Sequence, residues 1–325
     1  MSKASENLQA LSESMAAAVQ EGEKSTVMVN ARLRYPASGL AIDKDLIITA
    51  SHAVEFEDNI QVGLPDGSTL KATLLGRDSN SDLALLQLEK AAASPASKVS
   101  EKAKVGQIAL ALGRPNENGI QASFGIVSAA LGPMQLRHGG FMEAHLRTDA
   151  IPYPGFSGGP LIDGEGKILG VNTSGIGRGR SITIPAEKVW AIADALKEHG
   201  SVKRGFLGIR GQIVELPKDS QALLKREQSS GILLVELEKD SPSAESDLKV
   251  SDIVVGFNSQ PIENHEELMA LLSGDIVGKS AKLEVLRGEK VKTIEVTVGE
   301  RKEQSHEHRG RFSRHAWHGR HFGRG

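Results

Sequence analysis

The feature that most constrains the fold is a succession of short apolar runs, separated by turn signals, between Thr26 and Asn172. Two of these signals are the Pro-Asp-Gly at 65–67 and the Asp-Gly at 163–164. Runs of this length and spacing favour an antiparallel barrel or sandwich over alternating strands and helices. The expected strands are Thr26–Val29, Leu46–Thr49, Ile60–Gly63, Leu83–Leu88, Ile108–Leu112, Gly125–Val127 and Lys167–Asn172.

Helices and a second group of strands flank this region. Residues 6–20 carry apolar side chains at helical spacing, and 185–197 begins with a proline and has one apolar face, so both are predicted helices. The polar, basic sequence after 300 is typical of disorder. The predicted organisation is a helical segment at 1–22, a strand-rich domain at 23–198, a linker at 199–204, a second domain at 205–300 and a disordered tail at 301–325.

Composition excludes several classes of chemistry. The chain has 325 residues and no cysteine, so disulfides, thiolate nucleophiles and cysteine-based zinc sites are all excluded. The apolar run near its start, Met15–Val19, is shorter than the core of about 7–15 residues that a signal peptide needs and far shorter than a membrane span. The sequence therefore predicts no membrane span and a cytoplasmic location, or a periplasmic or other extracytoplasmic one if it is a processed form.

The segment GFSGGP places Ser157 between glycines and matches the G-x-S-x-G motif of a nucleophile elbow. An elbow in an α/β-hydrolase needs a helix after the serine and a histidine later in the domain. Here Pro160 and a strand-turn-strand pattern follow the serine, and the later histidines lie outside the strand-rich region. The elbow interpretation therefore fails on its context.

A different order of catalytic groups is available within the strand-rich region. His52, Asp82 and Ser157 follow one another in the chain order of chymotrypsin-type proteases. A serine hydroxyl is a weak nucleophile and needs an imidazole to take its proton and a carboxylate to orient that imidazole. By residue type alone, Asp78 serves as well as Asp82.

Several segments, in order, resemble the HtrA (Deg) family of trypsin-like serine proteases with a C-terminal PDZ domain. They are TASHAV, SDLALLQLE, ALGRPNENGIQASFGIVSA, TDAIPYPGFSGGPL and SITIP. The resemblance covers 23–300 and implies a mainly β fold: a chymotrypsin-like double β-barrel protease domain, then a PDZ domain of strands with short helices. The match of DLALL to a family strand favours Asp82 over Asp78 as the triad carboxylate.

Carried over by position, the resemblance implies a nucleophile at Ser157, a general base at His52 and an orienting carboxylate at Asp82. The backbone N–H groups of Gly155 and Ser157 then form the oxyanion hole. The family usually has asparagine where this chain has Phe156. The packing of that ring either holds the loop in its active form or locks it in a collapsed one, and the sequence leaves both open.

The expected specificity pocket is apolar. Trypsin relatives that cut after Lys or Arg carry an acid six residues before the serine, where this chain has Ile151. Val171, Thr173 and Ile182 are the other residues expected to line the pocket, which predicts small or medium apolar side chains before the scissile bond. Each of these four residues can equally be part of the core.

The second domain resembles a PDZ domain through RGFLGI and the helical NHEELMALLSG. Such domains add a peptide as an extra strand and hold its terminal carboxylate with backbone N–H groups. The residues expected to do so are Gly205, Phe206, Leu207 and Gly208. Ser246, Asp247 and Ser251 depart from the family's A-G-L-x-x-G-D-I turn, which weakens the turn but keeps the fold.

The resemblance implies an ATP-independent serine endopeptidase of protein quality control, without a cofactor or a catalytic metal, that cleaves unfolded or misfolded proteins and forms homotrimers. One rival is a silent chaperone or PDZ adaptor in which Phe156 closes the oxyanion hole. A second is a protease that stays inactive until a peptide binds the PDZ groove. The tail holds five Arg and five His after 305, so a metal ion, nucleic acid or a membrane surface remain alternative ligands for it.

Overall fold

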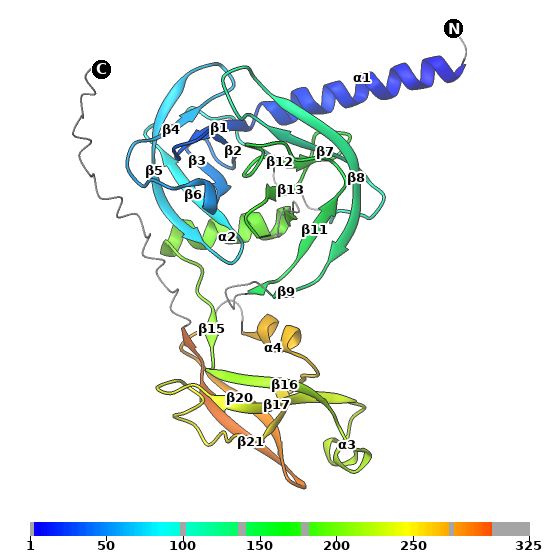
Figure 1. Cartoon of the computed structure of the whole chain (residues 1–325), viewed down its shortest axis with the longest axis vertical. Coiled ribbons are helices and arrows are strands. Elements are labelled where there is room, and N and C mark those ends of the chain that lie inside the picture. Colours follow the sequence, from blue (N-terminus) through cyan, green and yellow to red (C-terminus); the bar gives the residue numbers. More distant parts are fainter. Residues whose placement is uncertain (1–2, 98–101, 136–140, 177–181, 273–275, 301–325) are drawn as a thin grey trace, which may run out of the picture.

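The computed structural model describes residues 3–97, 102–135, 141–176, 182–272 and 276–300 (Figure 1). Two closed six-stranded barrels lie side by side, and a separate sheet domain follows them. The predicted mainly β fold, with a double-barrel domain followed by a second domain of strands and short helices, is confirmed. The tail expected to be disordered lies outside the described residues.

The first barrel closes in the order β1-β2-β3-β6-β5-β4. Its β3 and β6 are apolar and almost wholly buried, because one face fills the barrel and the other packs against the rest of the domain. The strands are β1 (Thr26–Asn30), β2 (Ala37–Ala41), β3 (Leu46–Ala50), β4 (Ile60–Gly63), β5 (Thr69–Asp78) and β6 (Leu83–Leu88).

The second barrel closes in the order β11-β14-β13-β12-β7-β8. Its strands are β7 (Ile108–Gly113), β8 (Gln121–Leu131), β11 (His145–Thr148), β12 (Pro160–Ile162), β13 (Ile168–Thr173) and β14 (Ile182–Pro185). A small hairpin of β9 (Met134–Gln135) and β10 (Phe141–Met142) lies beside it. All the barrel strands pair antiparallel, as the spacing of the apolar runs predicts.

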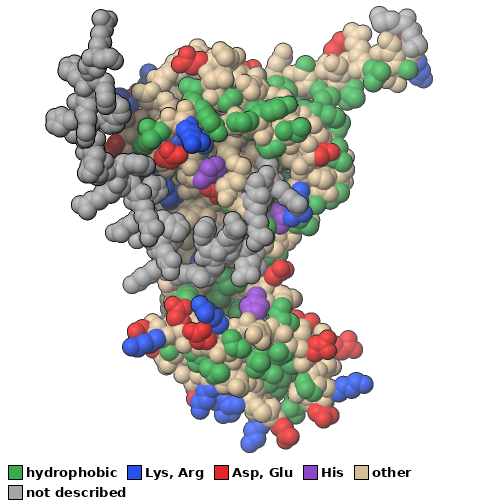
Figure 2. Space-filling model, in the orientation of Figure 1, with side chains coloured by type: hydrophobic (Ala, Val, Ile, Leu, Met, Phe, Trp, Pro, Cys, Tyr) green, Lys and Arg blue, Asp and Glu red, His purple; other side chains and the backbone are tan. Residues whose placement is uncertain are grey.

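Two helices accompany the barrels. Helix α2 (Ala186–His199) starts after Pro185, ends at Gly200 with φ +71°, and buries Val189 and Trp190 in the core between the barrels. Helix α1 (Lys3–Glu23) is longer than predicted and projects from the double barrel, with apolar side chains visible along it (Figures 1 and 2). No helix among the described residues is long and apolar enough to cross a membrane.

The second domain is a twisted sheet in the order β16-β17-β18-β20-β21. Helix α4 packs Leu268 and Leu272 on its core. The elements are β15 (Gly205–Phe206), β16 (Ile209–Glu215), α3 (Lys218–Leu224), β17 (Ser230–Leu237), β18 (Ile253–Phe257), β19 (Gln260–Pro261), α4 (His265–Leu271), β20 (Ser280–Arg287), β21 (Lys290–Thr297) and β22 (Gly299–Glu300).

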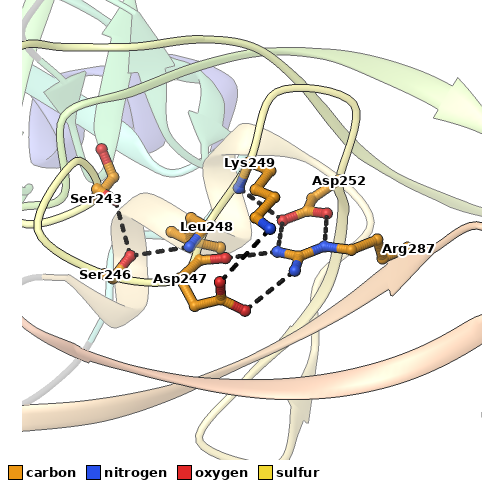
Figure 3. A network of polar contacts seen from close by, with 7 residues as sticks. All are labelled: Ser243, Ser246, Asp247, Leu248, Lys249, Asp252 and Arg287. Carbon is orange, nitrogen blue, oxygen red and sulfur yellow. Dashed lines mark hydrogen bonds and ion pairs between the residues drawn. The ribbon is translucent and has the colours of Figure 1, made fainter.

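A polar network replaces the glycine-rich turn of the family's PDZ domain (Figure 3). Ser246 donates to the Ser243 carbonyl at 2.8 Å and accepts from the Leu248 N–H at 3.2 Å. Arg287 binds both carboxylate oxygens of Asp252 at 2.7 Å and also contacts Asp247. The turn that the departures from the family pattern were expected to weaken is therefore held by side-chain hydrogen bonds.

Candidate active site

The candidate catalytic residues come from both barrels. His52 lies in a 3₁₀ turn, Ser51–Ala53, that directly follows β3, and Asp82 immediately precedes β6, the partner of β3. The Ser51 N–H donates to the Asp82 carbonyl at 2.8 Å, which ties the two segments together. Ser157 lies in the loop before β12 of the second barrel.

Asp82 holds His52 by two hydrogen bonds. The His52 Nδ1 and the Asp82 Oδ2 are 2.6 Å apart, and the His52 backbone N–H donates to Asp82 Oδ1 at 2.8 Å. Asp82 is 6% exposed, whereas the His52 side chain is 32% exposed. A carboxylate in this position accepts the Nδ1–H, fixes the tautomer and leaves Nε2 free to exchange a proton.

Thr173 supports the carboxylate, a contact that the sequence did not reveal. Its hydroxyl, at the end of β13, donates to Asp82 Oδ2. It also accepts the Gly175 N–H at 3.1 Å. A side chain at Gly175 would collide with both Asp82 and His52, so a glycine is required where this loop crosses the pair.

The hydroxyl of Ser157 lies in a cavity of about 210 Å³ that His52 also lines. Ser157 Oγ and Ser174 Oγ are 3.0 Å apart and share a hydrogen bond. Within the described residues no hydrogen bond joins Ser157 to His52. Apo enzymes commonly hold the nucleophile and base more loosely than the substrate complex does, so the missing hydrogen bond is compatible with a catalytic pair.

The loop before Ser157 forms a tight turn. The Phe156 N–H donates to the Tyr153 carbonyl at 3.0 Å, and Gly155 has φ +91°, the combination found in a type II turn. The backbone N–H groups of Gly155 and Ser157 have no acceptor among the described residues. Two unused N–H donors beside the hydroxyl are what an oxyanion hole requires.

Phe156 points away from the cavity and into the core of the second barrel. Its side chain is fully buried among residues of the strands, and its ring meets that of Tyr153 edge-on at 5.5 Å. The space is made by Gly113, where any side chain would collide with the ring. The apolar ring therefore anchors the loop from behind and leaves the two N–H donors uncovered.

The four residues expected to line the specificity pocket occupy different environments. Thr173 lines the cavity but directs its hydroxyl to Asp82. Val171 and Ile182 are buried in the core cluster, and Ile151 is 61% exposed. The segment 177–181, between β13 and β14, lies outside the described residues.

The expected carboxylate-binding loop of the PDZ domain lies at the start of the edge strand β16. The Gly205 N–H donates to the Leu272 carbonyl at the end of α4. By contrast, the N–H groups of Leu207 and Gly208 have no acceptor among the described residues. His265, the first residue of α4, contacts the Gly211 carbonyl of β16 at 3.1 Å, so α4 flanks this strand edge.

Asp78, the alternative triad carboxylate, has another partner. Arg204 in the interdomain linker binds both its oxygens, at 2.5 and 2.7 Å, and Ser81 donates to it at 2.6 Å. Burial acts to raise the pKa of Asp78, but the hydrogen bonds and charge of Arg204 outweigh it and hold this pKa below the ordinary value of 3.8. It is Asp82, not Asp78, that contacts His52.

Comparison with known proteins assigns both domains. Residues 37–171 match a trypsin-like peptidase domain and 205–298 match a PDZ domain. The chain is 35% identical over 270 residues to the probable periplasmic serine endoprotease DegP-like of Pseudomonas putida (strain W619), covering 81% of this chain and 55% of that one. The probable periplasmic serine protease do/HhoA-like of Haemophilus influenzae is 34% identical, covering 80% and 57%.

Solved structures agree with these relatives. The HtrA-type protease AlgW with tripeptide has a TM-score of 0.76 and 26% identity, and the match covers 89% of this chain and 97% of that one. The serine endoprotease from Yersinia pestis has a TM-score of 0.71 and 26% identity, over 89% and 98%. The chain belongs to the HtrA (Deg) family. This HtrA-family chain spans about half the length of the curated relatives it matches.

One expectation is wrong. The sequence predicted a cytoplasmic protein, whereas the relatives of this HtrA-family chain are named periplasmic endoproteases. The prediction rested only on the composition of the first residues. Without cysteine, neither the barrels nor the PDZ domain carries a disulfide that would mark an oxidising compartment.

Proposed function

We propose that this chain is an ATP-independent serine endopeptidase that uses Ser157 as nucleophile, His52 as general base and acid, and Asp82 as the orienting carboxylate. The observation that carries the proposal is the His52–Asp82 pair beside the Ser157 hydroxyl in one cavity, next to two unused N–H donors. Trypsin-like peptidases work with this constellation.

In the first half-reaction, the Ser157 hydroxyl attacks the carbonyl carbon of the scissile bond while His52 Nε2 accepts its proton. The N–H groups of Gly155 and Ser157 stabilise the oxyanion, each contributing about 3 kcal/mol to transition-state binding. His52 then donates its proton to the leaving amine. Water then attacks the acyl carbon while His52 accepts its proton, and His52 returns this proton to Ser157 as the acyl group leaves. Asp82 stays ionised throughout.

The position of Phe156 supports an active enzyme over a silent chaperone or adaptor. In a collapsed oxyanion loop, the N–H group of Gly155 or Ser157 would point away from the cavity or donate to an acceptor within the protein. Here the ring is buried in the barrel core, and both N–H groups remain without an acceptor among the described residues.

One contact supports regulation of that activity. Ser157 shares a hydrogen bond with Ser174 instead of His52, so the resting serine is not yet paired with its base. The free N–H groups of Leu207 and Gly208 suit the carboxylate of a peptide C-terminus, which would lie along the β16 edge. We propose that occupation of this groove shifts Ser157 toward His52.

The biological setting follows from the family. The periplasmic naming of the relatives supports work in that compartment. Unfolded or misfolded proteins are the proposed substrates, and a homotrimer is the proposed assembly. The exposed apolar residues Phe124, Ile126 and Leu131 on β8 offer a surface for such an assembly.

Cleavage of an unfolded, reduced protein substrate tests the proposal. The wild-type chain should degrade it without ATP or a metal ion, while Ser157→Ala and His52→Ala should each lose at least about a thousandfold in rate. A folded protein of the same composition is the control. Degradation that persists in Ser157→Ala would overturn the assignment of the nucleophile.

A further inference from the structure

A fixed cation lies in the active-site cavity, at Arg32. Among the described residues that line the cavity, Arg32 alone carries a permanent charge, and none of them is acidic. Asp82 is not part of this lining, and its carboxylate is hydrogen-bonded to His52 and Thr173. The catalytic chemistry described above makes no use of Arg32.

Arg32 is held in place by its own loop. Its Nε donates to the Tyr35 carbonyl at 2.6 Å, and its Nη2 donates to the Pro36 carbonyl at 3.3 Å. The guanidinium lies over the Tyr35 ring, 4.8 Å from its centroid, which adds a cation–π attraction. Nη1 has no partner among the described residues, so a preorganised donor remains available to a ligand.

No carboxylate of the described protein neutralises this guanidinium. Glu55 contacts the loop of Arg32, but its Oε2 accepts the Leu33 N–H, at 3.4 Å. No ion pair between Arg32 and any acidic residue is present in the described part of the chain. A half-buried cation without a counter-ion favours an anionic ligand.

Arg32 lies on the side of the cavity where the leaving group must sit. The Ala31 carbonyl accepts the N–H groups of Glu55 and Phe56, so the loop of Arg32 is tied to the segment just after His52. His52 delivers its proton to the leaving amine, which must therefore lie beside His52 on the first-barrel wall. The second-barrel wall, with Ser157 and Ser174, faces the acyl group.

We propose that Arg32 is a specificity residue that selects an acidic side chain, Asp or Glu, in the first two positions after the scissile bond. The inference rests on the proposed function and adds a substrate class to it. Guanidinium–carboxylate pairing of this kind is directional, because the planar fork of Arg matches a carboxylate.

Acyl transfer to peptide amines tests this side of the site separately from the acyl side. Ser157 first attacks the carbonyl carbon of a thiobenzyl ester of an Ala-Ala-Val peptide; the C–S bond breaks, the serine proton passes through His52 to the sulfur, and benzyl thiol leaves. The added amine attacks the acyl carbon, the ester bond to Ser157 breaks, and the amine proton returns to Ser157 through His52. Two matched pairs of acceptors differ only in charge: Glu-Ala-amide against Gln-Ala-amide, and Ala-Glu-amide against Ala-Gln-amide.

The expected result is a transfer rate for at least one Glu acceptor roughly two- to fivefold above that of its Gln partner, the upper part of the range that a partly exposed ion pair supports. Arg32→Gln should bring that ratio to about one, and Arg32→Glu should reverse it in favour of a Lys acceptor. Arg34→Gln is the matched control, because Arg34 lies in the same loop, is exposed and does not line the cavity. It should keep the wild-type ratio.

Three results would overturn the inference. If a wild-type enzyme that hydrolyses the thioester transfers the acyl group equally to both acceptors of each pair, it has no acidic preference. The proposed function then remains intact. If the preference for the Glu acceptor survives in Arg32→Gln, a group other than Arg32 causes it. A wild-type chain that hydrolyses no thioester, with or without a peptide that has a free C-terminus, overturns the proposed function, and the inference with it.

Discussion

The ion pair between Arg204 and Asp78 gives the most specific stability prediction, for the variant Arg204→Met. Asp78 is completely buried and accepts two hydrogen bonds from Arg204 and two from Ser81. Methionine keeps the apolar stem but removes both strong donors and the positive charge. Leaving one member of a buried pair uncompensated costs about 3–5 kcal/mol, so the free energy of unfolding at pH 7 should fall by that amount.

The pH dependence distinguishes this cause from a loss of packing. In the wild type the pKa of Asp78 lies below its ordinary value of 3.8, so the stability that it contributes is present above that value and is lost as the pH falls through the lowered pKa. In Arg204→Met burial dominates and raises the pKa of Asp78 above the ordinary value. The penalty should therefore shrink as the pH falls from 7 toward about 4.

Urea unfolding followed by tryptophan fluorescence measures this effect. Trp190 is buried in α2, and Trp317→Phe removes the other tryptophan of the chain. Asp78→Asn combined with Arg204→Met should recover part of the loss, because no buried charge remains. An Arg204→Met variant within about 1 kcal/mol of the wild type at pH 7, or a loss that is the same at pH 4, would refute the reasoning.

Three further predictions concern single side chains. Thr173→Val removes a donor from Asp82 and should lower kcat/KM about 10- to 100-fold, while Thr173→Ser keeps most activity, as steady-state kinetics on a peptide amide will measure. Ser251→Gly relieves a left-handed backbone at φ +78° and should raise the free energy of unfolding by about 0.5–1 kcal/mol in urea titrations; an equal or lower value contradicts this. Burial, more than Arg147, lowers the pKa of His145 below 6.5, so stability should fall as the pH drops below 6.5, and His145→Gln should remove that slope.

The strands that the sequence predicted well are those with few polar residues. Ile60–Gly63 and Leu83–Leu88 agree with the structure at both ends, and all but one residue of each strand is buried. The polar β5 was missed, because it alternates between buried and exposed positions over ten residues that include Gly76 and Arg77.

The candidate site divides in the same way. His52, Asp82 and Ser157 could be predicted because each lies in a segment with a recognisable local pattern. The hydrogen bond from Thr173 to Asp82 could not, because it joins residues 91 apart whose meeting depends on how the two barrels pack. The same holds for Arg204, which the sequence placed in a linker without a role, and for the buried ring of Phe156, whose direction depends on the space at Gly113.

Labelling with a fluorophosphonate probe, followed by mass spectrometry of the adduct, tests the central claim most directly. We expect one adduct, on Ser157, that forms faster when a peptide with a free C-terminus is present and is absent from Ser157→Ala. No adduct with or without peptide, from a protein that unfolds cooperatively, would contradict the claim that His52, Asp82 and Ser157 form a working catalytic site.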